Sequence, residues 1–128
     1  MKFHHVGYIV ENISQAILEW GEFGFKLKSE IFSIHDQQVD VCFLTNFGDS
    51  YIELVKPHSG NNVLLRYLKG KVRYYHLAYQ SKEYMKICDD FESKGAHKIT
   101  EFYSEAFDNK RCCFFLMPDS NLIEIIEE

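Results

Sequence analysis

Hydrophobic and polar positions follow the same succession twice along this chain. Residues 3–10 and 73–80 are rich in aromatic and β-branched side chains, which is typical of strands. After each segment the apolar positions recur at helical spacing, and a glycine follows, Gly24 in one case and Gly95 in the other. Each copy then continues with three further segments of strand character, at 26–34, 39–46 and 51–56 and at 97–104, 110–117 and 121–127. The pattern predicts two βαβββ modules, with eight strands and two helices in all.

The two copies align without a gap at a constant offset of 71 residues. His5 then matches His76, and Glu53 matches Glu124. Other identical pairs at this offset are Tyr8 with Tyr79, Gly24 with Gly95, Cys42 with Cys113, Phe43 with Phe114 and Ile52 with Ile123. Each copy is too small to bury a sheet face alone, so we expect both to share one structure. The sequence predicts a single domain over 1–128, with module one at 3–57, a connector at 58–72 and module two at 73–127.

The overall composition narrows the class of protein. The chain has 128 residues, of which 46% are hydrophobic and 26% charged, the balance of one globular domain. A net charge of −5 disfavours nucleic-acid binding, and no apolar run approaches the ~20 residues of a membrane span. The N-terminal segment lacks the uninterrupted apolar stretch of a signal peptide. We therefore expect a cytoplasmic protein that binds neither nucleic acid nor a membrane. The four cysteines form no Cys-x-x-Cys motif and are predicted to be small buried hydrophobes.

The four repeated polar residues share one kind of strand face. Strand side chains alternate between faces, so the apolar residues next to each of the four face the helices, and the four themselves lie on the opposite face. Carboxylates placed among leucine and valine need a compensating cation or a proton. Two imidazoles and two carboxylates are suitable ligands for a divalent metal ion. The pattern predicts a metal site made by His5, Glu53, His76 and Glu124; hydrogen-bonded core residues are the alternative.

Four segments carry a resemblance to a known group of proteins: "HHVGYIVENISQAILEW", "YIELVKP", "YYHLAYQ" and "NLIEIIE". They resemble the vicinal-oxygen-chelate superfamily, which includes glyoxalase I, methylmalonyl-CoA epimerase, extradiol dioxygenases and bleomycin resistance proteins. The resemblance covers essentially the whole chain. It implies an α+β fold in which two tandem βαβββ modules form a cup-shaped, eight-stranded mixed sheet around one metal ion. It also implies that the four repeated residues bind nickel, cobalt, zinc or manganese, and, by analogy, that the protein is a homodimer.

The set of ligands resembles that of bacterial glyoxalase I. The resemblance implies a lyase or isomerase that moves a proton next to the metal-bound carbonyl of a thiol adduct. Glu124 would be the main base, and Glu53 the opposing ligand or a second base. Asp40 is an alternative base, because it lies near the position of a catalytic glutamate in the epimerases; a solvated acid near a turn is the other interpretation. Two further functions stay open: an isomerase of an acyl-CoA thioester, like methylmalonyl-CoA epimerase, and a non-catalytic small-molecule binding or resistance protein. The epimerases usually have glutamine where Glu53 stands.

Several other residues are candidates for contacts with the substrate. Tyr51 and Tyr74 neighbour the predicted ligands and are candidates for the pocket wall. Two basic segments, Lys110–Arg111 and the stretch of Arg66, Lys69, Lys71 and Arg73, are candidates for binding the anionic end of glutathione or coenzyme A. Solvated surface charge is the alternative for both. His4 receives no role, because strand alternation places it on the face opposite His5.

Overall fold

The computed structural model describes residues 1–46 and 48–128, which form two compact units. Unit 1 consists of Met1–His5 and His76–Glu128, and unit 2 consists of Val6–Tyr75. Strands β1 (Lys2–Ile9) and β6 (Tyr74–Ser81) each contribute residues to both units. The two histidines at equivalent positions of these strands, His5 and His76, therefore belong to the same unit.

Unit 2 contains helix α1 (Ile13–Gly21) and the strands β2 (Lys26–Leu27), β3 (Phe32–Ile34), β4 (Val39–Thr45) and β5 (Tyr51–Pro57). Strand β4 pairs antiparallel with β5, and β2 and β3 also pair antiparallel with β4. The apolar face of α1, with Ile13 and Ala16, packs on Cys42, Leu44 and Leu54. The side chain of Asn12 caps the helix by accepting a hydrogen bond from the backbone N–H of Gln15.

The prediction of one continuous strand at 26–34 is wrong, because this segment forms two short strands, β2 and β3. The hydroxyl of Ser29 accepts a hydrogen bond from the backbone N–H of Phe43 at 3.0 Å. This side-chain contact takes the place of a backbone carbonyl opposite β4, so the regular strand pairing is interrupted between β2 and β3. The described residues consequently form nine strands where eight were predicted.

The connector also contains an element that the sequence analysis did not predict. Helix α2 (Asn62–Lys69) follows β5, and the side chain of Asn61 caps it by accepting from the N–H of Leu64. The buried side chain of Leu64 anchors the helix. The leucines of this segment recur at helical spacing, and this spacing could have predicted the helix from the sequence.

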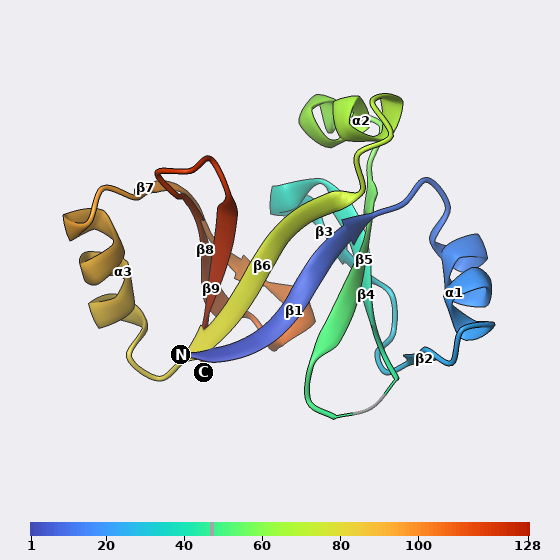
Figure 1. Cartoon of the computed structure of the whole chain (residues 1–128), viewed down its shortest axis with the longest axis horizontal. Helices are drawn as coiled ribbons and strands as arrows, with labels where there is room; N and C mark the ends of the chain where they lie inside the picture. Colours follow the sequence, from blue (N-terminus) through green and yellow to red (C-terminus); the bar gives the residue numbers. More distant parts are fainter. Residues whose placement is uncertain (47) are drawn as a thin grey trace. The chain divides into compact units, whose positions relative to one another are not determined.

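Unit 1 combines β6 with helix α3 (Tyr84–Ser93) and the strands β7 (His97–Ser104), β8 (Lys110–Leu116) and β9 (Leu122–Glu127). The strand order is β6-β9-β8-β7; β6 and β9 are parallel and the other two pairs are antiparallel. Figure 1 shows α3 beside the β7–β9 strands, and its residues Tyr84 and Cys88 pack against Cys113, Phe115 and Ile125. The predicted helix and strands of this module are confirmed, and the strand arrangement is mixed as expected.

The repeated polar residues are all buried in the structure. The exposed fractions are 0% for His5, 5% for Glu53, 1% for His76 and 3% for Glu124. The four cysteines are buried as predicted, and all are free thiols. No helix among the described residues has the length and apolar character needed to cross a membrane.

Candidate metal centre

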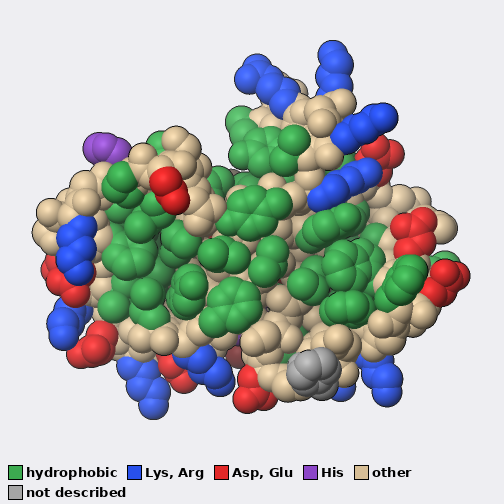
Figure 2. Space-filling model, viewed as in Figure 1, with side chains coloured by type: hydrophobic (Ala, Val, Ile, Leu, Met, Phe, Trp, Pro, Cys, Tyr) green, Lys and Arg blue, Asp and Glu red, His purple; other side chains and the backbone are tan. Residues whose placement is uncertain are grey.

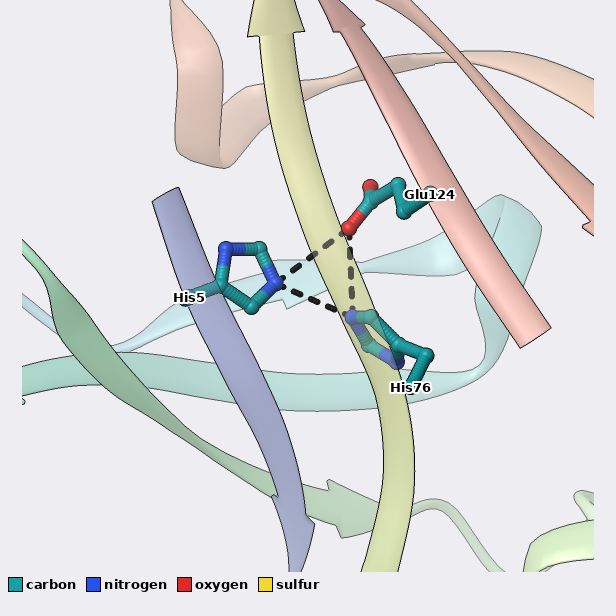
Figure 3. A group of neighbouring side chains, drawn as sticks. All are labelled: His5, His76 and Glu124. Carbon is teal, nitrogen blue, oxygen red and sulfur yellow. Dashed lines mark hydrogen bonds and ion pairs between the residues drawn. The ribbon is translucent and has the colours of Figure 1, made fainter. Parts of the chain in front are cut away.

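Three of the predicted ligands meet in the interior of unit 1 (Figure 3). The Nε2 atoms of His5 and His76 lie 3.0 Å apart. The Glu124 Oε2 atom lies 3.3 Å from Nε2 of His5 and 3.2 Å from Nε2 of His76. The side chains come from β1, β6 and β9, so residues distant in the sequence converge on one point.

Strand pairing explains how His76 and Glu124 come to share a face. Strands β6 and β9 are parallel, and Ala78 is the partner of Glu124 in this pairing. His76 lies two residues before Ala78 and therefore points to the same side of the sheet. The ring of Phe114, the partner of Glu124 on β8, makes an edge contact with the His76 ring at 5.0 Å between centroids. The neighbouring strand thus helps to hold the imidazole in place.

The spacing of the three donor atoms fits a divalent metal ion. Metal–nitrogen and metal–oxygen bonds of zinc are about 2.0–2.2 Å long. Two ligands at that distance lie ~3.0 Å apart at a right angle and ~3.4 Å apart at a tetrahedral angle. The three distances between the donor atoms of His5, His76 and Glu124 are 3.0, 3.2 and 3.3 Å, and all fall in this range. The triangle therefore has the dimensions of one face of a coordination polyhedron.

Hydrogen bonds alone satisfy this triangle poorly. A neutral imidazole carries one proton, so one Nε2–H can donate to the Glu124 carboxylate. If the other Nε2 has no proton, its lone pair faces a carboxylate oxygen, and if both carry protons, the two N–H groups oppose each other at 3.0 Å. A shared cation removes both conflicts, because all three atoms then direct lone pairs at it. Hence the chemistry of the donor set fits a metal ion.

The electrostatics of the cluster keep Glu124 ionised. Burial raises the pKa of this carboxyl, but hydrogen bonding and electrostatic interaction with the adjacent imidazoles of His5 and His76 lower it by more. The pKa of Glu124 is therefore lowered to about 2. An ionised carboxylate is the form that binds metal.

His4 takes part in the cluster, although sequence reasoning assigned it no role. Its Nδ1 lies 2.8 Å from Nδ1 of His5. Burial, together with the charge of His5, lowers the pKa of His4 to about 4, which leaves the ring neutral near neutral pH. Strand alternation predicts the face of a residue, but it does not describe a long side chain that bends toward its neighbour. The consecutive histidines were the signal for this contact.

The fourth predicted ligand, Glu53, belongs to unit 2. It lies on β5 opposite Phe43 of β4. Burial, together with the charge of Glu53, raises the pKa of the Cys42 thiol to about 12. Tyr51 also belongs to this unit and makes an edge contact with Phe43 at 6.1 Å, whereas Tyr74 is 44% exposed. Their roles and the place of Glu53 in the ligand set stay predictions.

Asp40, the alternative base, is engaged elsewhere. Its Oδ1 accepts a hydrogen bond from Nε2 of His58 at 2.8 Å. Burial raises the pKa of Asp40, but the hydrogen bonds from His58 and Ser33 lower it by more, so the net pKa is below its usual value. Asp40 pairs with Lys56, whereas Glu53 lies across from Phe43, three residues further along β4. An odd separation in a strand puts the Asp40 side chain on the face opposite that of Phe43. The role of Asp40 as a base stays a prediction.

The candidate substrate contacts on β8 differ in their surroundings. Lys110 is exposed at the start of the strand. The Arg111 guanidinium forms an ion pair with Glu127 at 3.1 Å and lies 4.5 Å above the ring of Tyr84. These two contacts within the protein are sufficient to hold the Arg111 side chain in its position, with no contribution from a substrate.

Comparisons with known proteins agree with this architecture. Residues 4–114 match the family model described as the Glyoxalase/Bleomycin resistance protein/Dioxygenase superfamily. No curated protein gives a significant match. Among solved structures, a hypothetical protein from Bacillus halodurans has a TM-score of 0.83 and 22% identity, covering 99% of this chain and 94% of its own.

Two epimerases are similar to the chain to the same degree. Methylmalonyl-CoA epimerase from Mycobacterium tuberculosis has a TM-score of 0.84 and 23% identity, over 98% of this chain and 87% of that one. A Streptomyces coelicolor methylmalonyl-CoA epimerase in complex with 2-nitronate-propionyl-CoA has a TM-score of 0.83 and 17% identity, over 100% and 94%. At such identities the likeness shows the fold, and the predicted α+β, glyoxalase-like fold is confirmed. Together with the family match, it shows that the chain belongs to the glyoxalase/bleomycin resistance protein/dioxygenase superfamily.

Proposed function

We propose that this protein is a divalent-metal-dependent lyase or isomerase of the glyoxalase I type. The observation that carries the proposal is the buried triangle of His5, His76 and Glu124, whose donor spacing and chemistry fit a metal ion. Glu53 would complete the set of ligands. A divalent ion held there would act as a Lewis acid toward a carbonyl oxygen of the substrate. Nickel, cobalt, zinc and manganese all suit nitrogen and carboxylate ligands.

The proposed role of Glu124 is to move the proton. Its carboxylate is almost fully buried, and burial raises the pKa of the carboxyl where the interactions with the histidines do not offset it. It would take the C–H proton from the carbon of the thiol adduct that bears the hydroxyl group, next to the carbonyl, and return it to the former carbonyl carbon, while the hydroxyl proton passes to the former carbonyl oxygen. A positioned acid or base of this kind contributes ~10²–10⁴ in rate. Glu53 would act as the opposing ligand or as a second base.

The test combines metal removal with a substrate assay. The purified protein is treated with a chelator, checked by elemental analysis, and assayed with the adduct of glutathione and a 2-oxoaldehyde. We expect activity to be lost and then restored by one of the four metal ions. The His76→Ala variant should stay inactive with metal, and His97→Ala, which changes an exposed histidine of the same unit, should behave as wild type. Full activity in a verified metal-free sample would contradict the proposal.

A second candidate, an acyl-CoA epimerase, is supported by the distribution of charge. Residues 54–82 contain six lysines and arginines and no acidic residue, in a chain of net charge −5. Among the described residues, none forms an ion pair with the four cations on and after α2, which are Arg66, Lys69, Lys71 and Arg73. Figure 2 shows lysine and arginine side chains gathered over this helix. Coenzyme A carries several phosphate charges, so it suits such a surface better than glutathione does.

Two assays separate the candidates. Epimerisation of methylmalonyl-CoA without hemithioacetal isomerisation would establish the second candidate, and the reverse result the first. For an acyl-CoA substrate, reversing the charge of Arg66 and Lys69 should raise KM and leave kcat unchanged. Tight binding without turnover of either substrate would instead indicate a binding or resistance protein.

We further propose a homodimeric, cytoplasmic protein with one domain over residues 1–128. Light scattering of the purified protein tests the dimer. One cooperative transition in calorimetry is expected if both modules fold together. Two separate transitions would contradict the single domain.

A further inference from the structure

A second imidazole lies against the ring nitrogen of His5 that does not face the cluster. The Nδ1 atoms of His4 and His5 are 2.8 Å apart, within hydrogen-bond distance. The other nitrogen of His5, Nε2, lies 3.0 Å from Nε2 of His76 and 3.3 Å from Oε2 of Glu124. His5 is fully buried. Both nitrogens of this ring are therefore engaged, one by His4 and one by the cluster.

The contact with His4 couples the proton positions of the two rings, because one Nδ1 must donate and the other accept. A neutral imidazole has one N–H and one lone pair. If His5 donates from Nδ1 to His4, its Nε2 lone pair points into the cluster. If His4 donates instead, the His5 proton is on Nε2 and lies between the other two donor atoms. Only the first arrangement leaves His5 able to bind a metal ion.

We propose that His4 is a positioning residue that accepts the Nδ1 proton of His5 and so directs the Nε2 lone pair at the metal. The inference rests on the proposed metal centre and adds a residue to it. Histidine ligands commonly donate their other N–H to a carboxylate or a carbonyl, and loss of such a partner typically weakens metal binding ~10–100-fold. Here the partner is the preceding residue of the same strand.

Phe107 holds the two rings in this arrangement. Its ring is stacked on that of His5, with 6.1 Å between centroids and 12° between planes. It also meets the His4 ring edge-on at 5.3 Å. Phe107 belongs to the single 3-10 turn Glu105–Phe107 between β7 and β8. This turn supports both imidazoles, so the acceptor nitrogen of His4 stays aligned with His5.

Three variants test the role of the acceptor. His4→Phe keeps a ring against Phe107 but removes the acceptor. His4→Asn places a carbonyl oxygen close to the position of the histidine Nδ1. His97→Phe is the control, because His97 is exposed on β7 of the same unit. Zinc dissociation constants are measured by competition with a chromogenic chelator. We expect His4→Phe to bind zinc 10–100-fold more weakly, while His4→Asn and His97→Phe stay close to wild type.

A second readout requires neither activity nor metal. Long-range ¹H–¹⁵N spectra of histidine-labelled, metal-free wild type distinguish the two tautomers of His5, and we expect the Nδ1–H form. The Nε2–H form would overturn the inference, as would wild-type zinc affinity in His4→Phe. An equal loss in His4→Asn and His4→Phe would also overturn it, because packing would then explain the effect. If His4→Phe does not fold, the tautomer seen in the wild-type spectra and the zinc affinity of His4→Asn still test the inference. Wild type that binds no zinc would defeat the metal centre itself, a result distinct from these.

Discussion

Replacing Glu124 by glutamine tests the proposed metal centre through protein stability. The substitution preserves the shape of the side chain but removes its charge. Glu124 is 3% exposed, and its Oε2 lies within 3.3 Å of both histidine nitrogens, so the amide would occupy the same place. An uncharged amide is a much weaker ligand for a divalent ion than a carboxylate is. The variant should therefore fold but bind metal poorly.

The expected size of the effect follows from linkage and chain length. A ligand at 100 times its Kd stabilises the native state by about 2.7 kcal/mol. For 128 residues, an unfolding entropy of ~2.1 cal/mol/K per residue converts this free energy into a Tm increase of ~10 °C. If the substitution weakens affinity ~100-fold, the same free zinc concentration gives about 0.4 kcal/mol, or a Tm increase of ~1.5 °C.

The assay is thermal unfolding with and without zinc, together with steady-state kinetics. Wild type should show the large shift, Glu124→Gln the small one, and kcat of the variant should fall ~10²–10⁴-fold. Glu105→Gln, a change at an exposed acid of the same unit, is the matched control and should behave as wild type. A zinc-induced shift of wild-type size in Glu124→Gln would refute the reasoning.

Three further predictions concern acid stability, the core and Asp40. The pKa of Glu124 is lowered to about 2, so this carboxylate stabilises the metal-free protein above the unfolded-state pKa near ~4.3, and the contribution is lost as pH falls toward 2. Thermal unfolding of the metal-free proteins should therefore show a larger loss of stability for wild type than for Glu124→Gln as pH falls through ~4.3 toward 2; equal slopes would contradict this. Phe115 is fully buried between α3 and the strands, so Phe115→Ala should lower the free energy of unfolding in urea by ~3–5 kcal/mol, and a loss below ~1 kcal/mol would argue against the packing described. Asp40→Asn should cost less than ~1 kcal/mol, because the ion pair with His58 is partly exposed, and should leave kcat nearly unchanged. A large fall in kcat would instead support Asp40 as the base.

The internal repeat made much of the fold predictable. Periodicity located the helices α1 and α3 and the strands of the second module, because their apolar faces pack on one side only. The split of 26–34 into two strands depends on the hydrogen bond from the Phe43 N–H to the Ser29 hydroxyl, a tertiary contact that no local pattern records. Helix α2 was missed because its short apolar face was interpreted as part of a turn-rich connector.

The candidate site was predictable to the extent that it follows from strand faces. Alternation placed His5, His76 and Glu124 on faces that do converge. It failed for His4, since alternation describes where a side chain leaves the strand and not where its ring ends. The hydrogen bond between Asp40 and His58 could not be predicted from the sequence either, because these residues are distant in the sequence and become neighbours only through folding.

The central claim is that one divalent ion is held by the two equivalent histidines and Glu124. Crystals grown with zinc and measured at the zinc absorption edge test it most directly. We predict one anomalous peak about 2.0–2.2 Å from Nε2 of His5, Nε2 of His76 and an oxygen of Glu124. A fully zinc-exposed crystal with no peak there, or with zinc only at surface histidines, would contradict the account.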